Sequence, residues 1–318
     1  MDTETRRQLL ADIASFYFVE KKTQAEIALI SGYSRSAISR ILTEAEDLGI
    51  IEIKIKYPLL REKELERRLQ KEFSLETAYV INSGLSDYSH NINLVGRLGA
   101  SYFQNNIFDG MVIGIGWGSS LYELVNALPF LHKSNIKVVQ VIGASGGKSD
   151  TRVDGPDLAA LLASKLSASH KFLHSPLFMD SEAACKSLKD QQQIKTTLEL
   201  GYLSDIVLLG IGTIDVDRLY SSIFRSGLIS EQEVKSIKAQ GGVANFCGVI
   251  LDENGIVLDI ELNRRTMAVD IQRLRLNGCK LIGIAAGSQK SQAINAVLKG
   301  NWLDILFTDS SAVLPILQ

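Results

Sequence analysis

This sequence of 318 residues lacks the features that mark several large protein classes. It has only 5 prolines and no low-complexity stretch, so a mainly disordered or collagen-like chain is excluded. Its 3 cysteines, Cys185, Cys247 and Cys279, lie far apart without a Cys-x-x-Cys motif, so neither a disulfide framework nor a structural zinc site is expected. No apolar run reaches the roughly 18–20 residues of a membrane span, and the N-terminal residues lack a signal-peptide core. We therefore expect a soluble, cytoplasmic protein with no membrane partner.

The excess of basic residues that often marks a nucleic-acid-binding protein is also missing. The chain has 34 Lys and Arg against 36 Asp and Glu, a net charge of −2. Residues 1–57 hold eight basic and nine acidic side chains, and only residues 21–40 show a local excess, with four basic residues against Glu26. Composition alone therefore does not predict DNA binding.

The first 57 residues have the pattern of a small helical unit. Apolar residues recur through 6–20 as they do on a buried helix face. Thr23 followed by Glu26 has the spacing of a capping box that opens a second helix, and Ser34 can cap a third helix that runs to about Leu48. The segment IIEIKIKY (50–57) alternates apolar and polar residues, which is typical of a half-buried strand. Together these signals predict a winged helix-turn-helix.

The third helix of this unit carries the residues that suit DNA recognition. Arginine can pair with guanine edges or phosphates, and serine and threonine can bond to either. The alternative is a small helical pair that binds protein or only supports the fold. With the capping Thr23, the predicted DNA-binding residues are Thr23, Ser34, Arg35, Ser36, Ser39, Arg40 and Thr43.

Pro58 marks the expected end of this unit. The following segment, 59–73, is highly charged and has one narrow apolar stripe at Leu65, Leu69 and Phe73. We expect a connecting helix within residues 58–76, which either packs on its own domain or takes part in a dimer contact.

From Thr77 onward, short apolar runs alternate with helical stretches. This order predicts an α/β domain over 77–318, with a large parallel, Rossmann-like sheet covered on both faces. One segment differs, because 248–260 places two apolar runs around Asp-Glu-Asn-Gly, the signal of an inserted hairpin. The predicted strands are 78–82, 111–116, 136–143, 171–177, 206–212, 280–287 and 304–309, and the predicted helices among them include 119–128, 157–168 and 289–298.

Glycine-rich segments follow four of these strands. Ligands of open parallel sheets bind at the carboxyl ends of the strands, where loops present backbone N–H groups to anions. The segment 114–120 (GIGWGSS) opens a helix, so the amides of 118–120 could hold a phosphate. The alternative is that these glycines only make tight turns. No GxGxxG, P-loop or metal-binding pattern of histidines is present, so we expect no cofactor and no metal.

The motifs TQAEIALISGYSRSAISRILTEAEDLGII, GIGWGSS, VIGASGG, VLLGIGT, NFCGVILDENG and IGIAAGSQKSQAINAVLKGNWLDILFTDSSAV together resemble the SorC family of sugar-responsive bacterial transcription regulators. The resemblance covers nearly the whole chain. It implies an N-terminal DNA-binding domain (1–57) and a large effector-binding and oligomerisation domain (77–318). That second domain is similar to sugar-phosphate isomerases and aminosugar-phosphate deaminases. The implied partners are an operator in double-stranded DNA, a phosphorylated sugar or polyol, and further copies of the chain in a homodimer or homotetramer.

The resemblance also implies an effector site. Two positions depart from the family: Asn245 stands where an acidic residue is common, and Ser145 where some relatives have a basic one. These departures suggest a different sugar or polyol, or a more negative ligand, and argue against a bisphosphate. The implied effector-binding residues are Gly116, Trp117, Gly118, Ser119, Ser120, Ser145, Gly146, Gly147, Gly212, Asn245, Gly287, Ser288 and Lys290.

The alternative function is an enzyme, a sugar-phosphate isomerase or deaminase with a DNA-binding appendage. The sequence offers no carboxylate or histidine base beside the glycine-rich loops, so no catalytic residue is predicted.

Overall fold

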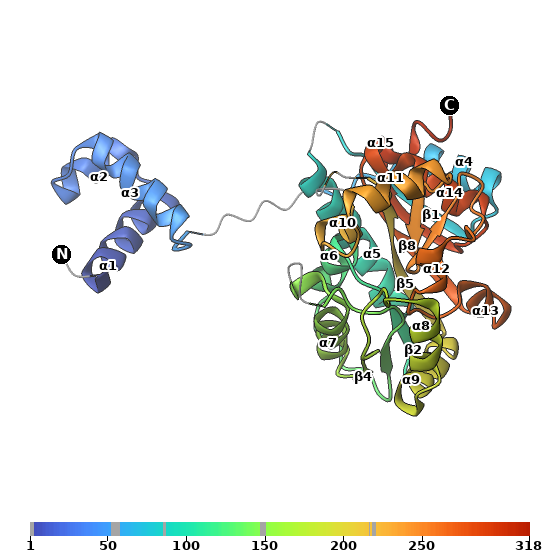
Figure 1. The fold of residues 1–318 in the computed structure, drawn as a ribbon. Coiled ribbons are helices and arrows are strands. Elements are labelled where there is room, and N and C mark those ends of the chain that lie inside the picture. The colour runs from blue at the N-terminus through green and yellow to red at the C-terminus, as the bar shows by residue number, and fades with distance from the viewer. Residues whose placement is uncertain (1–2, 52–57, 85–86, 147–150, 216, 218–220) are drawn as a thin grey trace. The chain divides into compact units, whose positions relative to one another are not determined.

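A computed structural model describes residues 3–51, 58–84, 87–146, 151–215, 217 and 221–318 (Figure 1). The chain divides into two compact units, Met1–Pro58 and Leu59–Gln318, each with its own hydrophobic core. The expected strand at 50–57 lies outside the described residues except for its first two positions, and so does Gly147. Within the described residues, no helix is long and apolar enough to cross a membrane.

The first unit consists of helices around a small apolar core. They are α1 (Thr3–Ala14), the π-helical turn η1 (Ser15–Val19), α2 (Gln24–Ser31) and α3 (Arg35–Asp47). The single helix expected over 6–20 is therefore split, because its last turn has π-helical geometry. Leu10, Ile27 and Ile38 are fully buried between the three helices.

The caps predicted for this unit are confirmed. Thr23 accepts the N–H of Glu26, and the Glu26 carboxylate accepts the N–H of Thr23 at 2.8 Å, which completes the capping box. Ser34 accepts the N–H of Ala37 at 3.2 Å at the start of α3. Gly32 ends α2 with φ of 74°, a left-handed conformation that glycine adopts without strain.

The second unit is built on a parallel sheet with strand order β1-β9-β8-β5-β2-β3-β4. Central residues such as Ile113, Leu208 and Ile282 are buried, as expected for strands covered on both faces. The parallel sheet predicted from the alternating pattern is thus confirmed. Its strands are β1 (Thr77–Ile81), β2 (Val112–Ile115), β3 (Lys137–Gln140), β4 (Ser169–Lys171), β5 (Ile206–Thr213), β8 (Lys280–Ile284) and β9 (Ile305–Asp309).

Helices and short turns connect the strands of this sheet (Figure 1). Among the longer ones, α5 and α6 pack closely, because Gly96 leaves room for the backbone of Glu123. The connections are α5 (Tyr88–Asn106), α6 (Ser119–Ala127), η2 (Thr151–Val153), α7 (Gly155–Leu166), α8 (Glu182–Lys189), α9 (Gln192–Tyr202), α10 (Ser222–Arg225), α11 (Glu231–Ala239), α12 (Glu261–Arg264), α13 (Ile271–Leu276), η3 (Ser288–Lys290), α14 (Ser291–Lys299) and α15 (Ser310–Val313).

Two expected elements are displaced. The strand predicted at 171–177 is the shorter β4, because after Lys171 the chain leaves the sheet and the N–H of Leu173 bonds to the side chain of Gln140. The hairpin predicted around 252–255 is displaced toward the N-terminus. Its main strand pairing is between β6 (Ala244–Phe246) and β7 (Val249–Leu251). The expected turn at 252–255 still forms, but the segments on either side of it are joined only by an isolated β-bridge between Leu251 and Val257.

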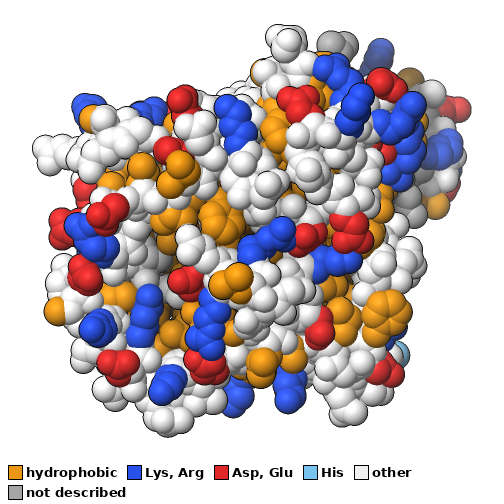
Figure 2. Space-filling model, turned by 90° about the vertical axis from the view of Figure 1, so that its right-hand side faces the viewer, with side chains coloured by type: hydrophobic (Ala, Val, Ile, Leu, Met, Phe, Trp, Pro, Cys, Tyr) orange, Lys and Arg blue, Asp and Glu red, His pale blue; other side chains and the backbone are white. Residues whose placement is uncertain are grey.

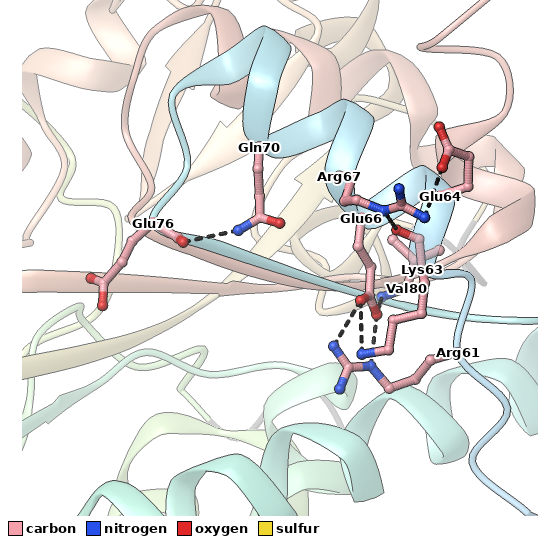
Figure 3. Close-up of polar contacts among 8 residues, drawn as sticks. All are labelled: Arg61, Lys63, Glu64, Glu66, Arg67, Gln70, Glu76 and Val80. Carbon is pink, nitrogen blue, oxygen red and sulfur yellow. Dashed lines mark hydrogen bonds and ion pairs between the residues drawn. The ribbon is translucent and has the colours of Figure 1, made fainter.

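The segment after Pro58 is anchored to the edge of the sheet. The N–H of Glu62 donates to the carbonyl of Val80, and α4 (Lys63–Phe73) packs against β1. Glu66 is only 4% exposed and accepts two hydrogen bonds of 2.7 Å from Arg61 and one from the N–H of Val80 (Figure 3). Burial favours the neutral acid, but the hydrogen bonds from Arg61 and Val80 win and hold the pKa of Glu66 below its ordinary value. The connecting helix therefore packs on the second unit.

Candidate functional site

A pocket of about 530 Å³, measured with its open mouth, lies at the carboxyl ends of β2 and β5. The turn between β6 and β7, the start of α10 and Lys290 complete its wall. This is the end of a parallel sheet at which ligands bind. Its lining residues are Gly116, Trp117, Gly118, Ser119, Ser120, Ile142, Leu177, Leu209, Gly210, Ile211, Gly212, Ser222, Ile223, Asn245, Cys247, Gly248 and Lys290.

The loop after β2 forms one side of the pocket. The indole N–H of Trp117 donates to the carbonyl of Gly143 at 2.9 Å, which holds this side chain in a buried position. Gly118 has φ of 126°, a conformation that favours glycine, and its N–H donates to the carbonyl of Val153 at 3.0 Å. This donor is thus engaged within the protein, and phosphate binding by the amide of Gly118 stays a prediction. Ser119 and Ser120, at the start of α6, are the other two residues whose amides are predicted to hold a phosphate.

Lys290 supplies the charge of the pocket. Its side chain is buried, with only 4% exposed, and Nζ donates to the carbonyl of Ile211 at 2.9 Å. Burial, assisted by the nearby positive charge of Arg225, lowers the pKa of Lys290 to about 8. Among the described residues that line the pocket there is no aspartate or glutamate. Within the described residues neither Lys290 nor Arg225 forms an ion pair, so the pocket carries positive charge without a counter-charge.

A polar network behind the pocket holds the Lys290 turn. Gly287 has φ of 96°, and a Cβ there would lie 2.9 Å from the ring of Tyr88. Its N–H donates to the fully buried carboxylate of Asp309 at 2.8 Å. Tyr88 also hydrogen-bonds Ser119, and burial is the main reason that its pKa is raised. Gly287 and the exposed Ser288 therefore shape the turn before Lys290 but do not line the pocket themselves.

The remaining predicted effector residues divide into two groups. Gly212 and Asn245 face each other in the β5–β6 pairing and both line the pocket, where the amide of Asn245 donates to the carbonyl of Val249 at 3.3 Å. Ser145 is buried, and its N–H donates to Asp154 at 2.8 Å. Neither Ser145 nor Gly146 lines the pocket.

Sequence reasoning missed residues that reach the pocket from distant segments. Ser222 and Ile223 belong to α10, which carried no glycine-rich signal, and Arg225 of the same helix acts on Lys290 only through its charge. Cys247 lies in the β6–β7 turn, and burial raises the pKa of its thiol to about 12, so it remains protonated at neutral pH and is no activated nucleophile. The Cys247-Gly248 pair, which follows Asn245 and Phe246, was the one local signal that could have placed this turn beside the site.

The first unit carries the second candidate site on α3. Its buried face consists of Ile38, Ile41, Leu42 and Ala45, and the opposite face is polar. Arg6 pairs with Glu44 through two hydrogen bonds and so joins α1 to α3. Thr23 and Ser34 are engaged as caps, and Thr43 donates to the carbonyl of Ser39 at 3.2 Å. All the residues predicted for DNA contact on α3 are exposed, namely Ser34, Arg35, Ser36, Ser39, Arg40 and Thr43.

These features define a class: a small helical unit whose last helix has an exposed polar face, followed by a parallel-sheet domain with a lysine-containing pocket. The second unit matches the family model described as "Putative sugar-binding domain" over residues 57–318, and the chain belongs to this family. The predicted resemblance to SorC regulators is confirmed by the relatives.

Two of these relatives are curated regulators that match over nearly their whole length. The deoxyribonucleoside regulator of Bacillus subtilis (strain 168) is 28% identical over 311 residues, 97% of this chain and 96% of that protein. The sorbitol operon regulator of Klebsiella pneumoniae is 27% identical over 315 residues, 97% of each chain. The crystal structure of the full-length SorC from Klebsiella pneumoniae has a TM-score of 0.72 at 26% identity and covers 98% of this chain and 99% of that one. These relatives are named as regulators rather than as enzymes.

Figure 2 shows one further face of the protein, on which basic and acidic side chains are interspersed. Positive charge is not concentrated on this face. Among the described residues that line the pocket there is one lysine, Lys290, and no acid.

Proposed function

We propose that this protein is a DNA-binding regulator of a carbohydrate-utilisation operon, controlled by a phosphorylated sugar or polyol that binds in the pocket of the second unit. The observation that carries the proposal is the buried Lys290, which has Arg225 near it and no carboxylate among the lining residues. A buried ammonium without a counter-charge is costly, and a bound phosphate supplies that counter-charge.

The rest of the pocket suits the uncharged part of such a ligand. Ser119, Ser120, Ser222 and Asn245 can donate and accept hydrogen bonds, as sugar hydroxyls require.

The exposed face of α3 supports the DNA-binding half of the proposal. Arg40 and Ser39 lie on a helix whose other face is buried, as in a recognition helix that enters the major groove. Self-association as a dimer or tetramer would align two such helices on half-sites about one helical turn apart. The protein would act in the cytoplasm, where the operator is. Effector binding would shift DNA affinity through a coupling of about 1–3 kcal/mol, or roughly 5–150-fold.

A thermal-shift screen tests the effector half. The purified chain is screened against phosphorylated sugars and polyols, their unphosphorylated counterparts, and inorganic phosphate. At about 100 times its Kd, a specific phosphorylated ligand stabilises the folded protein by roughly 2.7 kcal/mol. Stabilisation by free sugars alone would contradict the proposed pairing of Lys290 with a phosphate. Conversion of a stabilising ligand above the level of a heat-killed control would favour the alternative function, a sugar-phosphate isomerase or deaminase.

Selection of operator sequences from a randomised DNA library tests the other half. Arg40→Ala is expected to weaken binding to the selected operator by about 1–3 kcal/mol if it contacts a base, while the effector-induced thermal shift is unchanged. Loss of both properties together would mean that the protein has unfolded.

A further inference from the structure

We propose that a hollow in the first unit, between η1 and the start of α3, holds one phosphate of the DNA backbone. Lys21 and Arg35 would pair with this phosphate. The proposal rests on the DNA-binding function proposed above, and it assigns a contact independent of base sequence in addition to the exposed face of α3.

The hollow is formed by the turn that joins η1 to α2. Tyr17, Lys21, Gln24 and Arg35 are among the residues that line it. The turn is held by backbone hydrogen bonds of 3.0 Å from Lys22 to Phe16 and from Glu20 to Ser15. Lys21 has φ of 56°, a left-handed conformation that residues with a side chain seldom adopt. The cation at position 21 therefore stands in a defined turn rather than in an extended linker.

The charges around the hollow separate into paired and unpaired cations. Lys22 pairs with Glu20 and lies over the ring of Phe16, 5.0 Å from its centroid. Lys21 and Arg35 are exposed, and within the described residues neither forms an ion pair. These two cations are therefore the ones available to an anion.

The carboxylate of the capping box does not neutralise them. Glu26 is held in the capping box by the N–H and the hydroxyl of Thr23, each at 2.8 Å. The hydrogen bonds from Thr23 hold the pKa of Glu26 below its ordinary value, so this carboxylate stays charged and occupied by the cap. The cap also takes the N–H of Glu26.

The position of the hollow indicates a DNA phosphate rather than a small anion. Arg35 is the first residue of α3, so the hollow adjoins the helix that carries Ser39 and Arg40. When a recognition helix enters the major groove, backbone phosphates border the groove, and contacts to them fix the register of the protein on the duplex. Two exposed cations in an open hollow bind a single dissolved phosphate weakly, because water and salt screen them.

The test measures DNA affinity of the full chain between 50 and 200 mM salt. Fluorescence anisotropy follows binding to the selected operator and to an unrelated duplex of the same length. The variants are Lys21→Gln and Arg35→Gln. Two controls remove a cation that is not assigned to the phosphate: Lys22→Gln, which also lines the hollow but is paired with Glu20, and Arg7→Gln, which is exposed on α1.

Lys21→Gln is expected to lower affinity for both duplexes by the same factor. Each phosphate contact contributes about 0.9 to the slope of log K against log salt, so the ratio of wild-type to variant affinity should shrink by about 3–4-fold from 50 to 200 mM salt. Arg35→Gln should lose at least as much, whereas the two controls should change neither affinity nor slope. Lys21→Arg should retain the wild-type slope, and the melting temperature and effector response should be unchanged in every variant used.

Several results would overturn the assignment. Equal losses in the Arg7→Gln control would show general electrostatic attraction, and a loss restricted to the operator would show base recognition. Competition by inorganic phosphate at constant ionic strength, without any change in the DNA salt slope of Lys21→Gln, would show a small-anion site. If the wild-type chain binds neither duplex at 50 mM salt, both the phosphate contact and the proposed DNA-binding function are wrong. Wild-type binding that Lys21→Gln leaves unchanged overturns only the phosphate contact.

Discussion

The two units present cations in opposite environments. In the second unit, Lys290 is buried in a pocket within the electrostatic influence of Arg225, and in the first, Arg35 and Arg40 are exposed on a helix. Charges in a buried site interact strongly and are little affected by salt, whereas exposed charges are screened beyond about 10 Å at 0.1 M salt. One buried cation is therefore enough to select a small anion. Exposed cations must act in number, as they do along a polymer such as DNA.

This difference also explains which cation titrates. Burial lowers the pKa of Lys290 to about 8, while arginine stays charged at any pH at which the protein is folded. The pocket can therefore lose its charge within an accessible pH range, and the exposed face of α3 cannot. The following predictions begin with the largest expected effect.

Lys290→Met should abolish the response to the phosphorylated effector. Loss of one partner of a buried, hydrogen-bonded charge pair costs about 2–5 kcal/mol, which corresponds to a decrease in affinity of at least about 30-fold. Isothermal titration with the ligand found in the screen measures this change. Lys299→Met, which removes an exposed lysine from the end of α14, is the control and should bind normally. Normal binding by Lys290→Met would place the phosphate elsewhere.

Effector affinity should fall above pH 8, approaching a tenfold decrease per pH unit, because the bound phosphate requires protonated Lys290. Lys290→Arg should bind without this dependence, and an equally steep decrease in that variant would exclude Lys290 as the titrating group.

The same group affects stability in the opposite direction. The folded pKa of about 8 lies below the ordinary 10.5, so the unfolded chain binds more protons between these values. The contribution of Lys290 therefore raises the stability of the ligand-free protein as pH increases from about 8 to 10.5. Denaturant titrations of wild type and Lys290→Met, compared across this range, isolate the contribution.

Asn245→Asp should weaken binding of the phosphorylated ligand by about 5-fold, because it introduces a carboxylate into a pocket that has none and offsets its positive charge. Unphosphorylated polyols should lose less. The operator affinity of the ligand-free protein, measured in parallel, should not change. Tighter binding of the phosphorylated ligand would show that Asn245 limits the site in another way.

Ser34→Ala should have the smallest effect, a loss of about 1 kcal/mol in the stability of α3, because it removes the hydroxyl that accepts the N–H of Ala37. Hydrogen exchange at the start of α3 should accelerate by about 5-fold, with no change in effector binding. Ser34→Asp should retain the cap but bind DNA more weakly, since its charge would face the phosphates. Full DNA affinity in that variant would remove Ser34 from the interface.

Local signals predicted much of the fold. Thr23, Glu26 and Ser34 cap the helices as their spacing indicated, since capping depends on residues within one turn of each other. The apolar runs of the second unit likewise predicted its parallel sheet, because strands covered on both faces require continuous apolar sequence. The prediction of β4 was wrong in its bounds, because pairing with β3 ends at Lys171 and the rest of the predicted run forms only an isolated bridge, between Pro176 and Ala144.

The candidate site was predictable only where a motif carried it. Gly116, Ser119, Ser120, Gly212, Asn245 and Lys290 meet in the pocket, as the order of strands and the family motifs implied. Ser145 and Ser288 do not, and Arg225 was missed, because neither a glycine pattern nor its spacing identifies it.

Sequence determines in this protein what neighbouring residues decide among themselves: helix caps, the turn at Gly32, strand periodicity and the motifs of its family. Tertiary structure alone decides which donors remain free and which charges are buried. The N–H of Gly118 donates to the carbonyl of Val153, and the buried ammonium of Lys290 donates to the carbonyl of Ile211 instead of to water. These contacts join residues 35 and 79 positions apart. The availability of a donor and the pKa of an ammonium depend on what surrounds them in space, and separation along the chain does not encode those surroundings.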